Sequence, residues 1–292
     1  MQKILFCFFA LITSGLFGQY LTDIPTKENT VLWKIEGKKL KTESYIFGTI
    51  HIVEKAQFHF PESLKKLVTK SDQIALEVAD LNQNTALQHM ILPTGSMFDF
   101  FTAEQKDSVI TWGAGLLQMD KKQFELAFGR MKPFTLIQLS VAPSMADMES
   151  YDLSIQNLAL ENNLPVLGLE TLADQMKIFD NMDTLDMRNM VMSGIREPEK
   201  SAKQLQELLK LYSEKNIDKM YSYTMESEEH QEVKKYQEQL LDNRNRNWIP
   251  IIEKMIKKKN TFIAVGAAHL GGPNGVLRLL EQKGYRLVPI HL

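Results

Sequence analysis

The stretch TFIAVGAAH, residues 261–269, joins five residues typical of a buried β-strand to a Gly-x-x-His motif. The stretch SYIFGTIH, residues 44–51, repeats this arrangement near the other end of the chain. Glycine allows a sharp turn or a close backbone approach directly after a strand, so each motif can present its histidine in a fixed direction. The chain has six histidines, and the matching contexts of His51 and His269 indicate that these two share one site.

Other short runs of apolar and β-branched residues predict the remaining strands of a sheet. Residues 31–35 alternate like a half-exposed strand, and a turn at 36–39 joins them to residues 41–47 in a predicted hairpin. The runs at 73–78 and 164–169 are nearly all apolar, as expected of parallel strands covered on both faces. A last run at residues 286–290 completes the predicted strands.

Helical patterns over residues 61–69, 151–161 and 273–283 lie between these strands. Alternation of helices and strands at this spacing predicts right-handed crossovers and an open parallel sheet. Two longer stretches, about 81–150 and 172–259, lack strand signals and are predicted as helical insertions that could cover the carboxyl ends of the strands. The predicted fold is therefore α/β, with a mostly parallel central sheet, an N-terminal hairpin and large helical insertions.

Residues 1–18 have the outline of a secretory signal peptide, because a short basic start precedes an apolar run over 4–17. The only cysteine, Cys7, lies inside this run, too early to serve as a lipoprotein anchor. The sequence therefore predicts that residues 19–292 form a single α/β domain with its helical insertions. This domain is expected to be exported to a periplasm or secreted, without disulfide bonds or a stable membrane anchor.

The charge balance does not favour a nucleic-acid partner. The chain has 34 Lys and Arg residues against 36 Asp and Glu residues, a formal net charge of −2. A balance of this kind gives no global attraction to nucleic acid or to an anionic membrane.

Four predicted strand ends carry a potential ligand or catalytic group: His51, Glu77, Glu170 and His269. Binding sites of open parallel sheets form beyond the carboxyl ends of the strands, so we expect these four side chains on one edge of the sheet. Glu77 is informative because an ionised carboxylate at an apolar strand is costly unless it is paired or bound to a metal. Glu170 has a second interpretation as the start of a helix, where a carboxylate suits the helix dipole.

Two imidazoles with one or two carboxylates form the ligand set of a catalytic divalent metal with open positions. The sequence predicts His51, Glu77 and His269 as metal ligands, with Glu170 as a further ligand or the general base. Such a metal lowers the pKa of a bound water toward about 7 and polarises a carbonyl group. The alternative for each histidine is a structural or solvated role in a loop.

Arg244 and Asn245 lie in the cluster DNRNRNW, residues 242–248, within a predicted amphipathic helix. Asparagine is a poor helix former, so three of them indicate side-chain hydrogen bonding. Arg244 and Asn245 could orient a catalytic carboxylate or hold a substrate carbonyl or carboxylate, and a solvated helix face is the alternative. Gly-x-Ser-x-Gly, a cysteine after residue 18 and His-Glu-x-x-His are all absent from the sequence, which argues against the common hydrolase classes.

These motifs resemble the TraB/GumN family, whose clan includes the Tiki metalloproteases, the erythromycin esterases and the haem-binding ChaN proteins. The resemblance covers residues from about 31 to 290 and rests on FGTIH (47–51), LE (76–77), LET (169–171), RN (244–245), VGAAHL (265–270) and GPNG (272–275). The two Gly-x-x-His motifs of the clan map onto His51 and His269. Its acidic positions map onto Glu77 and Glu170.

The resemblance implies an α/β core with a helical insertion. Through the Tiki branch it implies metal-dependent peptide hydrolysis, with manganese or cobalt as the ion and zinc as an alternative. The ChaN branch binds haem, and the esterase branch opens an ester without an obvious metal requirement. We therefore expect an exported metal-dependent hydrolase, a peptidase, acting on a peptide or small-molecule substrate. The alternatives are a haem- or peptide-binding protein without turnover, a metal-independent esterase with a histidine base, and a catalytically silent interaction protein.

Overall fold

The computed structural model describes residues 28–38, 40–79, 87–141, 147–225 and 234–292. The predicted signal peptide, residues 1–18, lies outside the described residues, so export stays a prediction. Among the helices of the described segments, none is long and apolar enough to cross a membrane.

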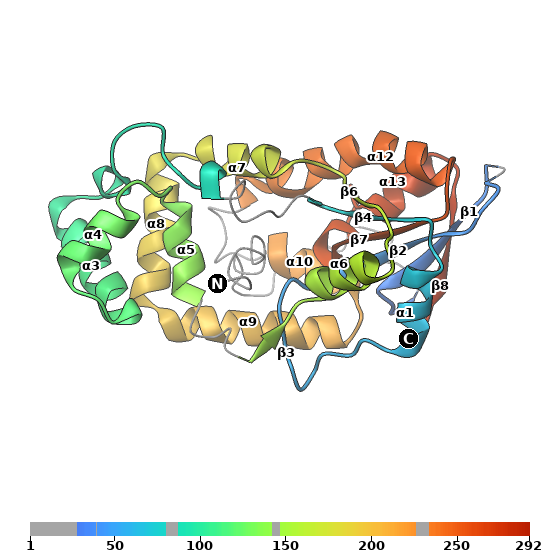
Figure 1. Ribbon diagram of the computed structural model, residues 1–292, viewed down its shortest axis with the longest axis horizontal. Helices are drawn as coiled ribbons and strands as arrows, with labels where there is room; N and C mark the ends of the chain where they lie inside the picture. Colours follow the sequence, from blue (N-terminus) through green and yellow to red (C-terminus); the bar gives the residue numbers. More distant parts are fainter. Residues whose placement is uncertain (1–27, 39, 80–86, 142–146, 226–233) are drawn as a thin grey trace.

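A six-stranded sheet forms the centre of the fold, in the order β6-β4-β7-β2-β1-β8 (Figure 1). Its strands are β1 (Leu32–Glu36), β2 (Ser44–Thr49), β4 (Gln73–Leu76), β6 (Val166–Gly168), β7 (Thr261–Gly266) and β8 (Arg286–Ile290). The strands from β6 to β2 run parallel, and β1 pairs antiparallel with both β2 and β8. The α/β fold, the mostly parallel sheet and the N-terminal hairpin are therefore confirmed.

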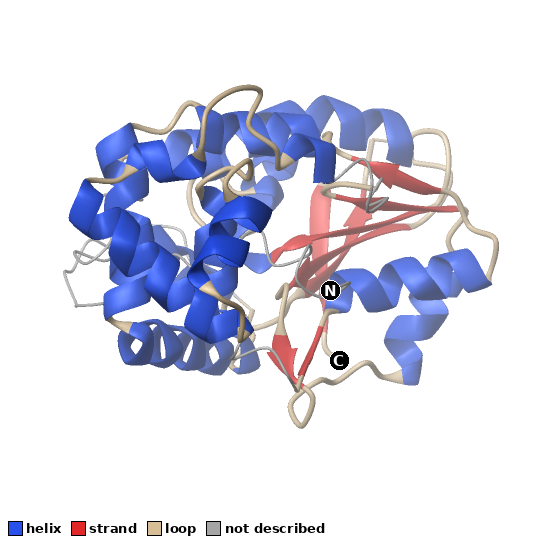
Figure 2. Ribbon diagram, turned by 60° about the vertical axis from the view of Figure 1, so that its left-hand side comes forward, coloured by secondary structure: helices blue, strands red, loops and turns tan. Residues whose placement is uncertain are grey.

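The interior strands β2, β4 and β7 are buried along their whole length. Helices lie on both faces of the sheet (Figure 2), which explains why these strands read as continuous apolar runs. The covering helices form two packed pairs, α1 (Glu62–Thr69) with α6 (Tyr151–Glu161) and α12 (Asn243–Ile256) with α13 (Val276–Gln282). The resulting core, here called the sheet core, includes Phe47, Ile155, Trp248 and Phe262.

A lobe of helices with its own hydrophobic core lies at the carboxyl ends of the parallel strands (Figure 1). The lobe contains η2 (Met97–Phe100), α3 (Ala103–Leu117), α4 (Lys121–Phe128), α5 (Phe134–Val141), α7 (Leu172–Asp180) and α8 (Thr184–Arg196). Its core, here called the lobe core, includes Phe98, Phe124 and Met187. The next helices, α9 (Pro198–Ser213) and α10 (Ile217–Met225), contribute Leu208 and Met220 to the sheet core.

The structure departs from the predicted elements in three places. Residues 81–150 include a short strand, β5 (Met148–Glu149), which pairs with β3 (Val53–Glu54) and is too short to give a strand pattern. Helix α12, inside the predicted 172–259 insertion, packs into the sheet core, because an amphipathic pattern does not say which core a helix covers. Strand β8 follows β7 through α13 but pairs antiparallel with β1 at the sheet edge.

The two Gly-x-x-His motifs lie side by side because β2 and β7 are parallel neighbours. A Cβ built on Gly48 would lie 2.9 Å from Leu270 Cδ1 and 3.1 Å from the Cα of Ala267. A side chain at this position would therefore push the second motif away from the first. The glycine of the first motif allows both histidines to approach the same edge of the sheet.

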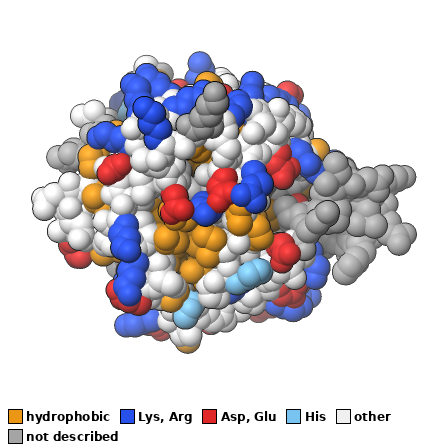
Figure 3. Space-filling view, turned by 90° about the vertical axis from the view of Figure 1, so that its right-hand side faces the viewer, with side chains coloured by type: hydrophobic (Ala, Val, Ile, Leu, Met, Phe, Trp, Pro, Cys, Tyr) orange, Lys and Arg blue, Asp and Glu red, His pale blue; other side chains and the backbone are white. Residues whose placement is uncertain are grey.

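The sheet ends at β8, on the face turned away from the helical lobe. This face carries apolar side chains bordered by Lys, Arg, Asp and Glu side chains (Figure 3). Pro289 lies in this edge strand, and Arg286 forms an ion pair with Glu36 of the neighbouring β1. Proline and charged residues at a sheet edge hinder the addition of a further strand, so the sequence of β8 protects the sheet edge.

Two glycines of α3 provide a matched test of packing in the lobe. A Cβ on Gly113 would lie 2.2 Å from Phe124 Cζ, whereas a Cβ on Gly115 would meet no atom within 4 Å. We expect Gly113→Ala to lower the free energy of unfolding by about 1–3 kcal/mol through overpacking. Gly115→Ala should raise it by about 0.5–1 kcal/mol, because alanine favours a helix over glycine. Urea unfolding followed by circular dichroism measures both effects, and a stabilised Gly113→Ala variant would contradict this packing.

Candidate functional site

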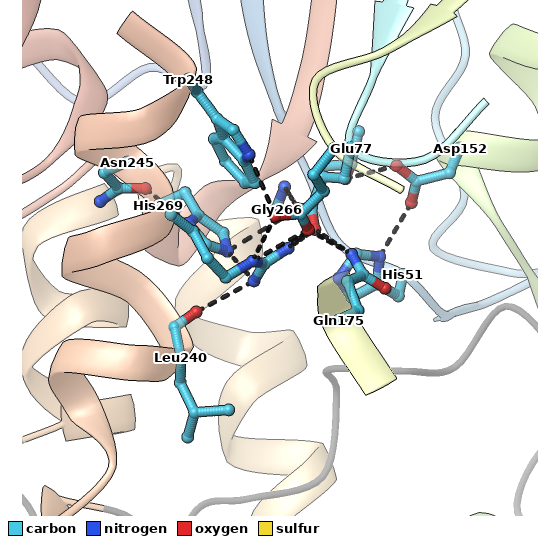
Figure 4. Close-up of polar contacts among 12 residues, drawn as sticks. His51, Glu77, Asp152, Gln175, Leu240, Asn245, Trp248, Gly266 and His269 are labelled. Carbon is cyan, nitrogen blue, oxygen red and sulfur yellow. Dashed lines mark hydrogen bonds and ion pairs between the residues drawn. The ribbon is translucent and has the colours of Figure 1, made fainter. Parts of the chain in front are cut away.

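The strand ends bring His51, Glu77 and His269 together, as the sequence predicts (Figure 4). A Cβ built on Gly266 would lie 3.3 Å from Glu77 Oε1, 3.4 Å from His51 Nε2 and 3.7 Å from His269 Cδ2. Glu77 directly follows β4, and His51 follows shortly after β2. His269 closes η6 (Ala267–His269), a short 3₁₀ helix that begins where β7 ends.

Arg244 lies at the centre of this cluster, and its contacts use every N–H group of the guanidinium. Nη2 donates to Glu77 Oε2 at 2.6 Å and to Glu170 Oε1 at 2.5 Å. Nε donates to both oxygens of Glu170, at 3.0 and 3.1 Å. Nη1 donates to the backbone carbonyl of Leu240 at 2.9 Å and to His269 Nε2 at 2.8 Å. The guanidinium is a buried positive charge compensated by two carboxylates.

The surroundings of Glu77 keep it ionised. Its Oε1 accepts a hydrogen bond from the backbone N–H of Gly266 at 2.8 Å, and its Oε2 accepts one from Gln175 Nε2 at 3.4 Å. Burial acts to raise the pKa of the Glu77 carboxyl, but the Arg244 guanidinium, the two neighbouring histidines and the Gly266 N–H together outweigh burial, and the pKa falls to about 2. Burial acts to lower the pKa of Arg244, but Glu77 and Glu170 together outweigh burial, and the pKa is raised above its ordinary value. The ion pair therefore persists throughout the neutral range.

Asn245 fixes the tautomer of His269. Its Nδ2 donates to the backbone carbonyl of Asn274 at 2.9 Å, so its Oδ1 faces His269 Nδ1 at 2.6 Å and accepts that proton. His269 Nε2 is then the acceptor for Arg244. The Trp248 ring lies over the imidazole, with a centroid distance of 4.5 Å. Burial and the neighbouring guanidinium hold the pKa of His269 well below its ordinary value, so His269 is neutral.

His51 forms a separate pair with Asp152, on helix α6. The Nδ1 atom of His51 donates to Asp152 Oδ2 at 3.1 Å, and Thr49 donates its hydroxyl to Asp152 Oδ1 at 3.0 Å. Burial acts to lower the pKa of His51, but the charges of Asp152 and Glu77 outweigh it, and the pKa is raised. This geometry turns His51 Nε2 toward Gly266 and the rest of the cluster. A histidine oriented by a carboxylate is suited to accept a proton at neutral pH.

Glu170 follows β6 and precedes Thr171, the N-cap residue of α7. Glu170 therefore lies next to the start of a helix, which is one of the two roles that the sequence suggests for it. It also belongs to the charged cluster. Gln175 Nε2 donates to its Oε1 at 2.7 Å, and Trp248 Nε1 donates to its Oε2 at 3.2 Å. With the bonds from Arg244, these contacts hold the carboxylate between α7 and α12.

Three residues of the cluster are not predicted from the sequence: Asp152, Gln175 and Trp248. All are buried, and each belongs to a helix rather than to a strand end. Asp152 lies in the first turn of α6, where an acidic residue is common because of the helix dipole. The position of Asp152 in the sequence therefore does not predict its contact with His51. Arg244 and Asn245 are also buried, so the solvated helix face does not describe them.

Two of the three predicted metal ligands, His269 and Glu77, have their donor atoms paired with protein groups. His269 Nε2 accepts from Arg244, and the Glu77 oxygens accept from Arg244, Gly266 and Gln175. Within the described segments, no group of three or more His, Cys, Asp or Glu side chains is arranged to hold a metal ion. Metal ligation needs neutral imidazole and carboxylate lone pairs directed at the ion. The cluster does not fit a divalent metal while Arg244 occupies its centre.

Comparison with known proteins identifies the family. The model of the TraB/PrgY/gumN family matches residues 31–289, which include both Gly-x-x-His motifs and every residue of the cluster. No curated protein and no solved structure matches the chain. The match extends over nearly the whole chain, and the protein therefore belongs to the TraB/PrgY/gumN family.

Proposed function

We propose that this protein is an exported hydrolase that opens an ester bond with His51 as the general base, without a metal ion. The observation that carries the proposal is the His51–Asp152 pair. Its 3.1 Å bond holds the imidazole with Nε2 directed at the cluster. The other histidine of the motif pair is unsuited to this role, since His269 Nε2 contacts Arg244. Export rests on the signal-peptide pattern of residues 1–18.

The proposed reaction needs only a water molecule as co-substrate. His51 Nε2 accepts a proton from water while the water oxygen attacks the ester carbonyl carbon. The tetrahedral intermediate then expels the alcohol oxygen, which takes the proton from Nε2, and leaves a carboxylic acid. Asp152 stabilises the imidazolium that forms between the two steps. An ester suits this chemistry better than an amide, because an alkoxide leaves more readily than an amine anion.

The exposure of the side chains indicates where a substrate would enter. His51 and Glu170 are 12% and 10% exposed, whereas Arg244 is 5% and His269 is 2% exposed. Substrate would therefore meet His51 and Glu170 first. In this proposal Arg244 and Asn245 are positioning residues, because their polar groups are bonded to protein atoms. For Arg244 to hold a substrate carbonyl or carboxylate, as the sequence suggests, the guanidinium would have to release one of these bonds.

Chelation distinguishes this proposal from the metal-dependent peptidase expected from the sequence. Residues 19–292 should hydrolyse p-nitrophenyl esters at an unchanged rate after exhaustive treatment with EDTA. A panel of unmodified peptides should remain intact under the same conditions. Loss of ester hydrolysis on chelation, with recovery on adding manganese, cobalt or zinc, would instead establish the metal-dependent mechanism. A Soret band after mixing with haem, without ester hydrolysis, would support the binding-protein alternative.

The pH dependence of hydrolysis should report the His51–Asp152 pair. Because the pKa of His51 is raised above its ordinary value of 6.5, kcat/KM should rise with pH through a value above 6.5 as the imidazole loses its proton. Asp152→Asn removes the charge that raises this pKa, so the rise should move to lower pH while kcat falls. Asp107→Asn, at an exposed ion pair with Lys121, is the control. An unmoved profile in Asp152→Asn would exclude His51 as the titrating base.

A further inference from the structure

The atoms that surround the Arg244 guanidinium have the chemistry of a metal site. One imidazole nitrogen, His269 Nε2, lies 2.8 Å from Nη1. Two carboxylate oxygens, Glu77 Oε2 and Glu170 Oε1, lie 2.6 and 2.5 Å from Nη2. Imidazole nitrogen and carboxylate oxygen are among the donors that Zn²⁺ takes in proteins.

Two of these donor groups, His269 and Glu77, are close enough to share one ion. His269 Nε2 and Glu77 Oε1 are 3.8 Å apart, and two ligands with bonds of about 2.0–2.2 Å to one zinc ion lie within about 4 Å of each other. His51 Nε2 approaches the same region, since it lies 3.4 Å from the Cβ position of Gly266. Within the described segments these side chains are not arranged to hold a metal ion, so they would have to move together once the guanidinium is removed.

Charge balance explains why a guanidinium and a metal ion exclude each other here. Glu77 and Glu170 supply two negative charges, and Arg244 supplies one positive charge from within the chain. A divalent cation in the same place would meet this buried positive charge at contact distance, where repulsion is strong because water is excluded. The cation would also need the lone pairs of His269, Glu77 and Glu170 that accept hydrogen bonds from Arg244.

We propose that Arg244 fills a latent divalent-metal site as an internal cation, and that removing its guanidinium opens the site to Zn²⁺. The inference concerns the same cluster as the proposed hydrolase but does not depend on turnover. A failure of ester hydrolysis would leave it intact, and its own failure would not affect the role of His51.

Zinc titration of the Arg244→Ala variant tests this inference. The variant should bind one Zn²⁺ per chain by isothermal titration calorimetry, at least about 10³-fold more tightly than the wild type, because a unit positive charge at contact distance has been removed. Zinc should also raise its thermal unfolding midpoint and leave that of the wild type unchanged. If the variant is unfolded without metal, circular dichroism should show that zinc restores the helical signal.

Three further variants separate a specific site from unspecific zinc binding. Arg244→Lys keeps a positive charge and should not gain zinc affinity. Arg244→Ala combined with His269→Ala removes a predicted ligand and should lose the bound ion. Arg246→Ala, at an exposed position on the same helix, should behave as the wild type. The inference is overturned if the wild type binds zinc as tightly as Arg244→Ala, or if that variant neither binds zinc nor folds with it.

Discussion

Replacing His51 with alanine is expected to reduce kcat/KM for ester hydrolysis by about 10²–10⁴-fold, the range that a positioned general base contributes. A general base acts on the proton that moves in the transition state, so the loss should appear in kcat more than in KM. Initial rates with a p-nitrophenyl ester, measured over a range of substrate concentrations, separate the effect on kcat from the effect on KM.

The chain offers a close control for this experiment. His59 is exposed, and its backbone N–H and carbonyl form hydrogen bonds with the Tyr151 hydroxyl. His59→Ala should therefore keep wild-type kinetics. Thermal unfolding of both variants checks that the fold is retained. Wild-type hydrolysis by His51→Ala would refute the proposed mechanism.

Arg244→Met should lower the free energy of unfolding by about 3–5 kcal/mol, the usual effect of removing one partner from a buried ion pair. The substitution fills a similar volume but leaves Glu77 and Glu170 buried without their cation. Urea unfolding at neutral pH measures the difference. Adding Glu77→Gln to this variant should recover part of the lost stability, because one uncompensated charge is then removed.

The neighbouring Arg246 provides the matched control. Its side chain is 43% exposed and forms a 3.6 Å ion pair with Glu238, so Arg246→Met should change stability by less than about 0.5 kcal/mol. An equal effect of both substitutions would contradict a central role for the Arg244 cluster.

The pH dependence of stability gives a second check on Arg244. In the wild type the pKa of Glu77 is lowered from 4.5 to about 2. The stability that follows from this shift is present above pH 4.5 and is lost as the pH falls toward 2. Without Arg244, burial makes Glu77 take up its proton at a higher pH. The stability difference between wild type and Arg244→Met should therefore narrow on acidification.

The sequence predicts the central part of the fold well, for a clear physical reason. Strands such as 261–266 are buried on both faces, so their sequence is apolar throughout, and the Gly-x-x-His motifs mark where two of them end. Parallel pairing of β2 with β7 then places both histidines on one edge. The contact between β3 and β5 was not predictable, because two-residue strands have no recognisable pattern.

The site is predictable in part. Residue type and position at a strand end single out His51, Glu77, Glu170 and His269, but they do not say which groups these side chains contact. The contacts of Arg244 and Asp152 depend on how α12 and α6 pack against the sheet, which amphipathic patterns leave open. The same donor set therefore suggested a metal ion, whereas the structure supplies a guanidinium from α12 in that place.

The presence of two hydrophobic cores gives the charged cluster a role in cooperativity. Leu76 and Trp248 belong to the sheet core, whereas Val78 and Leu240 belong to the lobe core. In the sequence, Glu77 lies between Leu76 and Val78. Arg244 lies between Leu240 and Trp248. Each partner of the central ion pair thus stands where the chain passes from one core to the other. We therefore expect the pair to couple the unfolding of the lobe to the unfolding of the sheet.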